Sequence, residues 1–213
     1  MPAVSIPSPA GARRPGRPRS QKARSAILAA AAHLIDEQGL RAISMDEVAE
    51  RAGVSKATIY RWWPSKGSLA LEVFLDQVLQ SQQPLPDQGS LRRDLLAHVT
   101  AVARSYGQTA TGRLLADLIG ELPADRELGT TLRSRVIEPI RTHNRLIFER
   151  AIARGEMRRS VDTDVAMDMI YGAIWERLLV QHGPLNERFA RNLVEIVLIG
   201  LEPRPSPVQT VKN

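Results

Sequence analysis

Apolar residues recur along most of this chain at intervals of three and four positions, which places them on one face of an α-helix. The first such face lies in residues 20–38 and consists of Ile27, Leu28, Ala31, Leu34 and Ile35. Ser20 is a residue type that caps helices, and Gly39 is one that ends them. Runs that alternate with a period of two are few, and no Asn-Gly hairpin signal occurs. The pattern therefore predicts an all-α protein.

The same periodicity predicts further helices over the rest of the chain, in residues 65–80, 90–106, 111–119, 125–154, 162–182 and 186–200. Pro139 lies inside the longest of these, so we expect a kink or a break near Glu138. Residues 81–90, SQQPLPDQGS, have the composition of a loop and mark the expected boundary between an N-terminal and a C-terminal part.

A tighter pattern in residues 44–69, SMDEVAERAGVSKATIYRWWPSKGSL, predicts two short helices joined by a turn. Ser44 and Glu47 have the spacing of a capping box at the start of the first helix. Gly53 stands where a left-handed residue ends that helix, and Ser55 can cap the second. This is the layout of a helix-turn-helix, in which the second helix enters a major groove of DNA.

The segment AGVSKATIYRWWPSK resembles the DNA-binding signature of TetR-type transcriptional regulators. The likeness runs from about Ser20 to Leu75 and continues weakly in the C-terminal part, in the helix pattern and in the phrase ARGEMRRSVDTD. Trp62 and Trp63 stand where family members usually carry His and then Phe. Trp63 can replace a core Phe, and the indole N–H of Trp62 can still donate to a phosphate. The resemblance implies a homodimer that binds double-stranded DNA and responds to a small molecule.

Ten residues are candidates for contact with DNA. They are Arg17, Arg19, Ser44, Ser55, Lys56, Thr58, Tyr60, Arg61, Trp62 and Lys66. Lys56, Thr58 and Arg61 are expected on the exposed face of the second short helix, where Lys and Arg favour guanine and the Thr methyl favours thymine. The resemblance implies that the two aromatic residues and Lys66 contact the backbone. Lys66 lies in the first turn of a helix, where a cation opposes the helix dipole unless a phosphate arrives.

The net charge of +6 belongs entirely to the N-terminal third, because residues 1–66 carry it and the remainder is neutral. A basic module joined to a neutral one indicates a polyanionic partner at one end only. Residues 1–19 are rich in Pro and small residues and are predicted to be disordered. Within them RRPGRPR resembles an AT-hook core, whose Arg17 and Arg19 would enter a narrow minor groove. A non-specific or solubilising basic tail is the alternative.

Composition and motifs favour neither an enzyme nor a membrane protein. The chain has no cysteine, and its four histidines do not have the spacing of metal ligands. No Walker loop, nucleophile elbow or dinucleotide fingerprint occurs. Residues 1–12 are too short and broken for a signal peptide, and no run approaches the ~18 apolar residues of a membrane span. We expect a cytoplasmic protein without a cofactor and without catalytic residues.

The resemblance also implies a dimer interface in the last two helices and a ligand cavity among the middle ones. The final helix is apolar nearly all round, so it needs cover on several sides. Candidate interface residues are Met169, Gly172, Phe189, Leu193, Ile196, Val197 and Gly200. Candidate cavity residues are Tyr106, Leu114, Asp117, His143, Phe148, Met169 and Trp175. Met and aromatic residues on apolar helix faces are more often core than cavity lining.

Taken together, the sequence predicts a basic arm in residues 1–19, a three-helix DNA-binding domain in 20–80, a larger helical ligand-binding and dimerisation domain in 81–201, and a tail in 202–213. The predicted function is a repressor that binds a palindromic operator as a dimer and is released by a small-molecule effector. One alternative is a DNA-binding regulator without a ligand, which a middle domain lacking a cavity would favour. The other is an enzyme with an accessory DNA module, which titratable side chains converging in a pocket would favour.

Overall fold

The computed structural model describes residues 17–81 and 85–201, and every regular element in this part of the chain is helical. The prediction of an all-α fold is therefore confirmed. The elements in chain order are α1 (Arg17–Gln38), α2 (Met45–Ala52), α3 (Lys56–Tyr60), α4 (Lys66–Ser81), α5 (Leu91–Tyr106), α6 (Ala110–Glu121), α7 (Arg126–Leu132), the π-helical η1 (Arg133–Ile137), α8 (Glu138–Ala153), α9 (Thr163–Val180) and α10 (Glu187–Leu201).

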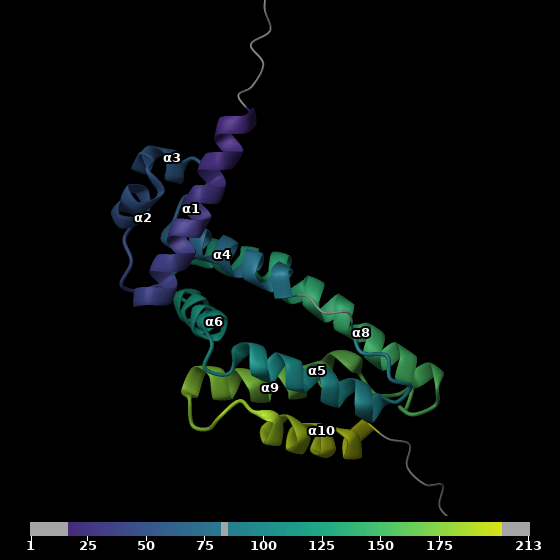
Figure 1. The fold of residues 1–213 in the computed structure, drawn as a ribbon. Coiled ribbons are helices and arrows are strands. Elements are labelled where there is room, and N and C mark those ends of the chain that lie inside the picture. Colours follow the sequence, from purple (N-terminus) through teal and green to yellow (C-terminus); the bar gives the residue numbers. More distant parts are fainter. Residues whose placement is uncertain (1–16, 82–84, 202–213) are drawn as a thin grey trace, which may run out of the picture.

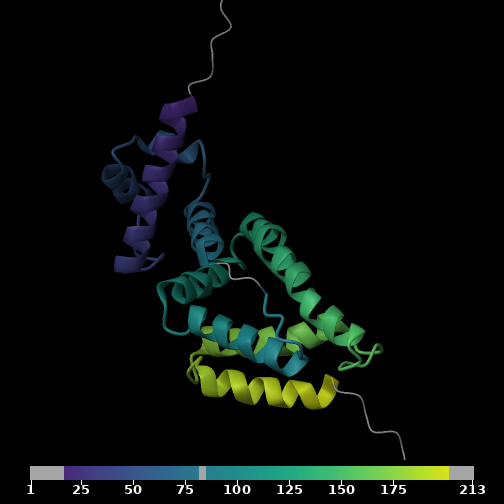
Figure 2. The ribbon, with the colours of Figure 1, turned by 45° about the vertical axis from the view of Figure 1, so that its right-hand side comes forward.

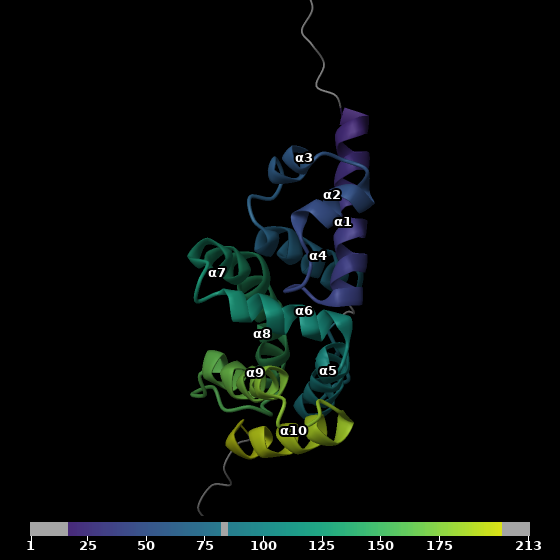
Figure 3. The same ribbon diagram turned by 90° about the vertical axis from the view of Figure 1, so that its left-hand side faces the viewer.

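The short helices α2 and α3 pack beside α1 at one end of an elongated molecule, and α10 forms the outer layer at the other end (Figure 1). Between these ends, α4 and α6 lie against each other, and α5 and α9 lie over α10 (Figures 2 and 3). Helix α8 runs diagonally from the level of α4 towards the far end of α5 (Figure 1). The predicted DNA-binding helices thus project from the end opposite to α10.

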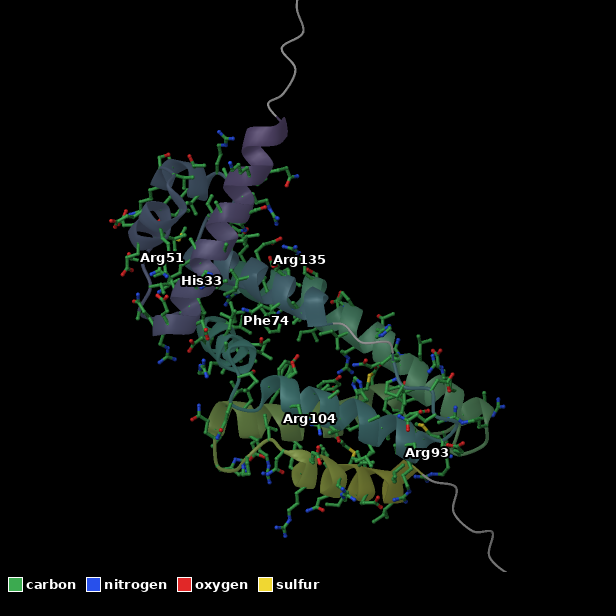
Figure 4. All side chains as sticks on the ribbon, viewed as in Figure 1. His33, Arg51, Phe74, Arg93, Arg104 and Arg135 are labelled. Atoms are coloured by element: carbon green, nitrogen blue, oxygen red, sulfur yellow. The ribbon has the colours of Figure 1, made fainter. Side chains whose placement is uncertain are left out.

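Two hydrophobic cores hold this arrangement, and their division does not coincide with the expected boundary near residue 81. The first core joins α1–α4 to buried side chains of α6, α7 and η1, such as Leu118 and Leu132. Phe74 of α4, fully buried, lies where α1, α4 and α6 come together (Figure 4). The second core joins α5, α8, α9 and α10. Helix α4 therefore belongs to a core shared by both parts of the chain.

The last residues of the predicted N-terminal arm are helical in the structure, which differs from the expectation of disorder. Helix α1 begins at Arg17, so the prediction of disorder is wrong for residues 17–19. Pro18 is compatible with this, because the first turn of a helix needs no backbone N–H from it. The backbone of Arg17 and Arg19 is therefore helical and not extended, and their contact with a minor groove stays a prediction. The rest of the predicted arm, residues 1–16, and the predicted tail, residues 202–213, lie outside the described residues.

The break expected near Glu138 takes the form of a π-helical turn. The N–H of Glu138 donates to the carbonyl of Arg133, five residues earlier, and α8 begins immediately afterwards with Pro139 in its first turn. Pro139 has no N–H to continue an α-helical bond pattern, so the wider turn comes directly before it. The predicted single helix over 125–154 is therefore divided into α7, η1 and α8, and η1 turns its buried Val136 towards the interior.

Candidate DNA interface and ligand cavity

Local signals build the helix-turn-helix as its sequence predicts. The Ser44 hydroxyl accepts from the Glu47 N–H at 3.2 Å, and a Glu47 carboxylate oxygen accepts from the Ser44 N–H at 2.7 Å, which completes the capping box of α2. Gly53 adopts φ 65° and ends α2 in the left-handed conformation. Ser55 then caps α3 by accepting from the Thr58 N–H at 3.3 Å. These contacts determine where α3 begins.

Helix α3 is fixed by its inner face and leaves its outer face open. Ile59 and Trp63 are buried, and the Arg24 guanidinium of α1 lies 5.7 Å from the centre of the Trp63 ring. Tyr60 and Trp62 remain 45% and 39% exposed, so both rings are open to a partner. A five-residue helix could not hold its orientation alone, so the buried anchors are what orient its exposed face.

The candidate base-reading side chains differ in how far they are engaged. Lys56 Nζ lies 2.8 Å from Asp46 Oδ2, and this contact raises the pKa of Lys56, so the side chain stays charged. The Thr58 hydroxyl lies 2.9 Å from the Ser55 hydroxyl. Arg61 is exposed and has no ion pair among the described residues. Arg61 is therefore the side chain of this face that is most available to a new partner.

Lys66 occupies a position that joins two helix N-termini. Its ammonium donates to the carbonyls of Arg41 and Ile43 at 3.1 and 3.3 Å, directly before the N-cap Ser44 of α2. These carbonyls offset the unfavourable position of a cation in the first turn of α4. The ammonium and the free N–H groups at the start of α2 consequently form a place suited to a phosphate.

A cavity of about 360 Å³ lies between α5, α6, η1, α8 and α9. Its lining residues are Tyr106, Leu115, Val136, Ile137, Ile140, Arg141, Asp168, Tyr171, Gly172 and Trp175. Of the residues predicted to line a cavity, Tyr106 and Trp175 do so. The π-turn of η1 contributes two apolar walls, which the sequence did not indicate because the register of a π-turn departs from the regular helical spacing.

The other predicted cavity residues have different surroundings and do not line this cavity. Leu114 and Phe148 are buried in the first and second hydrophobic cores. Asp117 faces Arg41 at 3.9 Å, while His143 and Met169 are exposed. Helical periodicity identifies an apolar face, but it does not tell whether that face meets another helix, an open space or solvent.

Tyr171 connects the cavity wall to a buried polar group that the sequence did not indicate. Its hydroxyl lies 2.9 Å from His98 Nε2 and accepts from Asn144 Nδ2 at 2.5 Å. Burial, with a smaller contribution from His143, lowers the pKa of His98 to about 4. Burial also raises the pKa of Tyr171. Both rings are therefore neutral at ordinary pH, and α5, α8 and α9 are joined through uncharged hydrogen bonds.

The outer faces of α9 and α10 expose large apolar side chains. Their most exposed members are Val165, Met169, Leu179, Val180, Ile196 and Ile199. Of the predicted interface residues, Met169, Gly172, Ile196 and Gly200 are exposed and Phe189 and Leu193 are half-buried. Val197 is 1% exposed and packs in the second core, so its assignment to a surface is wrong. Ile199, 81% exposed, replaces it on the open face.

Other kinds of site find no support in the described residues. No group of three or more His, Cys, Asp or Glu side chains there could hold a metal ion. None of the helices in residues 17–81 and 85–201 has the length and apolar character to cross a membrane.

Comparison with known proteins assigns both parts of the chain to one family. Residues 27–73 match the family of bacterial regulatory proteins, tetR family, and residues 85–197 match the tetracyclin repressor-like C-terminal domain. Over 187 residues the chain is 37% identical to an uncharacterized HTH-type transcriptional regulator, YdeS, of Bacillus subtilis (strain 168), covering 88% of this chain and 93% of that protein.

Two further relatives carry more informative descriptions. The chain is 31% identical over 183 residues to a DNA-binding transcriptional repressor TetR of Mycobacteroides abscessus, covering 86% of this chain and 95% of that one. The crystal structure of the TetR family transcription regulator SCO0332 shares 35% identity, with a TM-score of 0.70 over 85% of this chain and 100% of that chain. The likeness thus extends over both the DNA-binding and the C-terminal helices.

Proposed function

The chain belongs to the TetR family of bacterial transcriptional regulators, and from this premise we propose that it is a dimeric repressor that leaves a palindromic operator when a small molecule fills the cavity. The observation that carries the proposal is α3, which is anchored by Ile59 and Trp63 while its outer face stays open. Repression is supported by the 31% identical relative, which is itself described as a repressor.

The proposed DNA contacts divide into two kinds. Arg61, Thr58 and Lys56 read base edges in the major groove, with Lys56 giving up or sharing its contact to Asp46. Lys66 and Ser44 bind a phosphate at the N-terminus of α2, and Tyr60, Trp62 and Ser55 contact the backbone beside α3. Phosphate contacts set the position of α3 in the groove, whereas base contacts determine which sequence is preferred.

Dimerisation is proposed through the exposed apolar face of α9 and α10. One recognition helix reads too few base pairs alone, and a two-fold symmetric dimer matches a palindrome with half-sites ~34–36 Å apart. Ile196 and Ile199, 65% and 81% exposed, would be costly to leave in water on a stable monomer and are suited to the centre of such an interface.

Effector control is proposed because the cavity lies one helix away from α4. Two cavity-wall residues, Val136 and Ile137, belong to η1, and the neighbouring Arg135 bonds Glu72 of α4 at 2.8 Å (Figure 4). Glu72 also bonds Arg24 of α1 at 2.5 Å. A molecule that displaces η1 would therefore shift α4 and α1, and with them the separation of the two recognition helices. This cavity favours effector control over regulation without a ligand.

The decisive experiment is operator selection from the source genome, followed by binding of the recovered site across a salt series. Specific binding should weaken steeply with salt because phosphate contacts release counterions. Lys66→Ala should weaken binding to operator and scrambled duplexes alike, by roughly ten-fold, and reduce the salt slope by about 1. Arg61→Ala should weaken operator binding more than scrambled binding, because it removes base readout.

Arg159→Ala serves as the matched control and should leave both affinities unchanged. It removes an exposed arginine between α8 and α9, at the end of the molecule away from α3 (Figure 1). If Lys66→Ala behaves like Arg159→Ala in affinity and in slope, the phosphate role of Lys66 is wrong. If no duplex is enriched by the wild-type dimer, the proposed function is wrong.

A further inference from the structure

The cavity has walls of one dominant chemistry. Apolar side chains from three elements line it, namely Leu115 of α6, Val136 and Ile137 of η1, and Ile140 of α8. Aromatic rings of α5 and α9 complete the wall. Its volume of about 360 Å³ lies near the lower end of the ~300–1,000 Å³ of small-molecule sites. A molecule that enters must replace its water shell with apolar contacts over most of its surface.

The charged groups at the wall are already balanced. Arg141 Nη1 lies 2.5 Å from Asp168 Oδ1, and Arg141 Nη2 lies 3.2 Å from Asp164 Oδ1. Asp164 also receives Arg145 Nη2 at 2.6 Å. Two guanidinium groups thus face two carboxylates, so the cluster has no net charge. A carboxylate, sulfonate or phosphate on a ligand would have to displace Asp168 from Arg141, and a cation would have to displace Arg141 from Asp168.

The polar end of Tyr171 is likewise occupied. Its hydroxyl accepts from Asn144 and lies 2.9 Å from Nε2 of His98, whose ring is neutral at ordinary pH because its pKa is about 4. Asn144 is 3% exposed, which removes it from contact with a ligand. Tyr171 consequently presents its ring to the cavity, while its hydroxyl is engaged by His98 and Asn144.

Two hydrogen-bond donors of the wall stay available. The Tyr106 hydroxyl and the Trp175 indole N–H have no hydrogen-bond partner among the residues that the structure describes, although both residues line the cavity. Burial raises the pKa of Tyr106, so its hydroxyl keeps its proton. An acceptor on a ligand would satisfy either donor, and leaving such donors without a partner when the cavity fills would cost binding free energy.

We propose that the cavity selects uncharged, largely apolar molecules of modest size that carry a hydrogen-bond acceptor such as a carbonyl oxygen. The paired charges at Arg141 exclude ionised ligands, the apolar walls provide the affinity, and Tyr106 with Trp175 provide the polar recognition. This inference rests on the proposed effector function and specifies the chemical class of the effector.

Fluorescent probes that differ by one group test this directly. N-phenyl-1-naphthylamine is uncharged, and 1-anilinonaphthalene-8-sulfonate is the same skeleton with an added sulfonate. The uncharged probe should bind the DNA-free dimer ~10-fold or more tightly than the sulfonate, since the sulfonate would lose its water shell against apolar walls and find the nearest cation already paired. Only the binding that depends on the cavity is compared.

Gly172→Phe shows how much of the probe binding depends on the cavity. A Cβ added at Gly172, a lining residue of the cavity, meets no atom within 4 Å, so a larger side chain can be attached there without moving the backbone. Ile140→Trp fills the cavity from α8 and gives a second measurement if Gly172→Phe disturbs α9. Both variants are checked by light scattering and should weaken the uncharged probe by ~10-fold or more.

Two wall variants should alter the preference between probes. Asp168→Asn leaves the Arg141 cluster with one excess positive charge, so the ratio of uncharged-probe to sulfonate affinity should shrink several-fold. Tyr106→Phe should weaken 6-propionyl-2-dimethylaminonaphthalene, an uncharged ketone, by roughly three-fold relative to N-phenyl-1-naphthylamine, because it removes one neutral hydrogen bond.

The inference is overturned if the sulfonate binds the cavity as tightly as its uncharged counterpart, or if neither filling variant weakens the uncharged probe. It is also overturned if Asp168→Asn and wild type show the same probe ratio. Operator binding is measured on the same samples without probe. Its loss in the wild type would contradict the proposed function, whereas probe preference alone decides the ligand class.

Discussion

The helix-turn-helix and the cavity wall differ in how their positively charged side chains are paired. At the helix-turn-helix end Arg61 is exposed without an ion pair among the described residues, and Lys66 bonds only to backbone carbonyls. At the cavity Arg141 is held by two carboxylates. A site that leaves cations open attracts a polyanion from a distance, whereas a site that neutralises them selects against ions at contact. The two proposals thus give the same residue type opposite roles, attraction of DNA beside α3 and selection against charged ligands at the cavity.

The largest expected effect is on dimer formation, because only a dimer brings two DNA-binding faces to the same operator. Ile199→Glu puts a charge in the centre of the exposed apolar face of α10, where an unpaired buried carboxylate would oppose association. The variant should be a folded monomer whose operator affinity falls towards the non-specific level, by ~10³-fold or more. Light scattering and operator binding on the same sample measure both.

Leu146→Glu is the matched control, because Leu146 is also an exposed aliphatic side chain, 39% accessible, but lies on α8. It should leave assembly and operator affinity unchanged. Val197→Glu should instead unfold the protomer, since Val197 belongs to the second core. A monomeric Ile199→Glu protein that binds its operator at wild-type strength would remove the need for a dimer.

The second prediction concerns the neutral group behind the cavity wall. In the unfolded chain His98 takes up a proton near pH 6.5, whereas in the folded protein it does so only near pH 4. The unfolded state therefore binds more protons between these values, and folding stability is lost as the pH falls through this window. The loss should reach up to about 3 kcal/mol at pH 4. Urea unfolding between pH 7 and pH 4 measures it.

His98→Gln provides the matched comparison for that measurement. A glutamine can still bond the Tyr171 hydroxyl but does not titrate, so this variant should show a smaller loss between pH 6.5 and 4. Carboxylates with lowered pKa, such as Asp164 and Glu47, lose their contributions at lower pH in both proteins. Equal pH slopes for wild type and His98→Gln would show that His98 is not the source.

How far the sequence could be interpreted follows the range of the contacts involved. The capping box of Ser44 and Glu47 and the turn at Gly53 act within a few residues, so the helix-turn-helix could be located directly. The charge cluster at Arg141 joins residues 23 and 27 positions apart, and the Tyr171 hydroxyl meets His98 73 positions away. Only the packing of α5, α8 and α9 brings these groups together, and no local pattern encodes that packing.

Val197 and Ile199 illustrate the same limit within a single helix. Both belong to an apolar α10, and the sequence placed Val197, but not Ile199, among the candidate residues of the dimer interface. The side of α10 that contacts α5 decides the outcome, and it buries Val197 while leaving Ile199 81% exposed. By contrast, the kink near Glu138 could be predicted from Pro139, because proline acts on its own turn.

The smallest expected effect lies at the contact between the two ends. Glu72 of α4 is half-buried and bonds Arg24 of α1 and Arg135 of η1, so one carboxylate joins the DNA-binding helices to the cavity wall. Glu72→Gln would leave two guanidinium groups facing each other without a carboxylate. Because both arginines are partly exposed and screened by solvent, the loss of folding free energy should be only about 1 kcal/mol.

The effect on coupling should be clearer than the effect on stability. In Glu72→Gln the uncharged probe should bind the cavity with wild-type affinity, since Glu72 is not a lining residue. The bound probe should, however, weaken operator binding less than it does in the wild type. Glu149→Gln is the matched control, because Glu149 is exposed on α8 and has no ion pair among the described residues. Suppose that Glu72→Gln and Glu149→Gln lower stability equally, and that the probe weakens operator binding in both as it does in the wild type. Glu72 then only tethers α4, and the cavity and the DNA-binding helices communicate through apolar contacts such as that between Leu128 and Gly67.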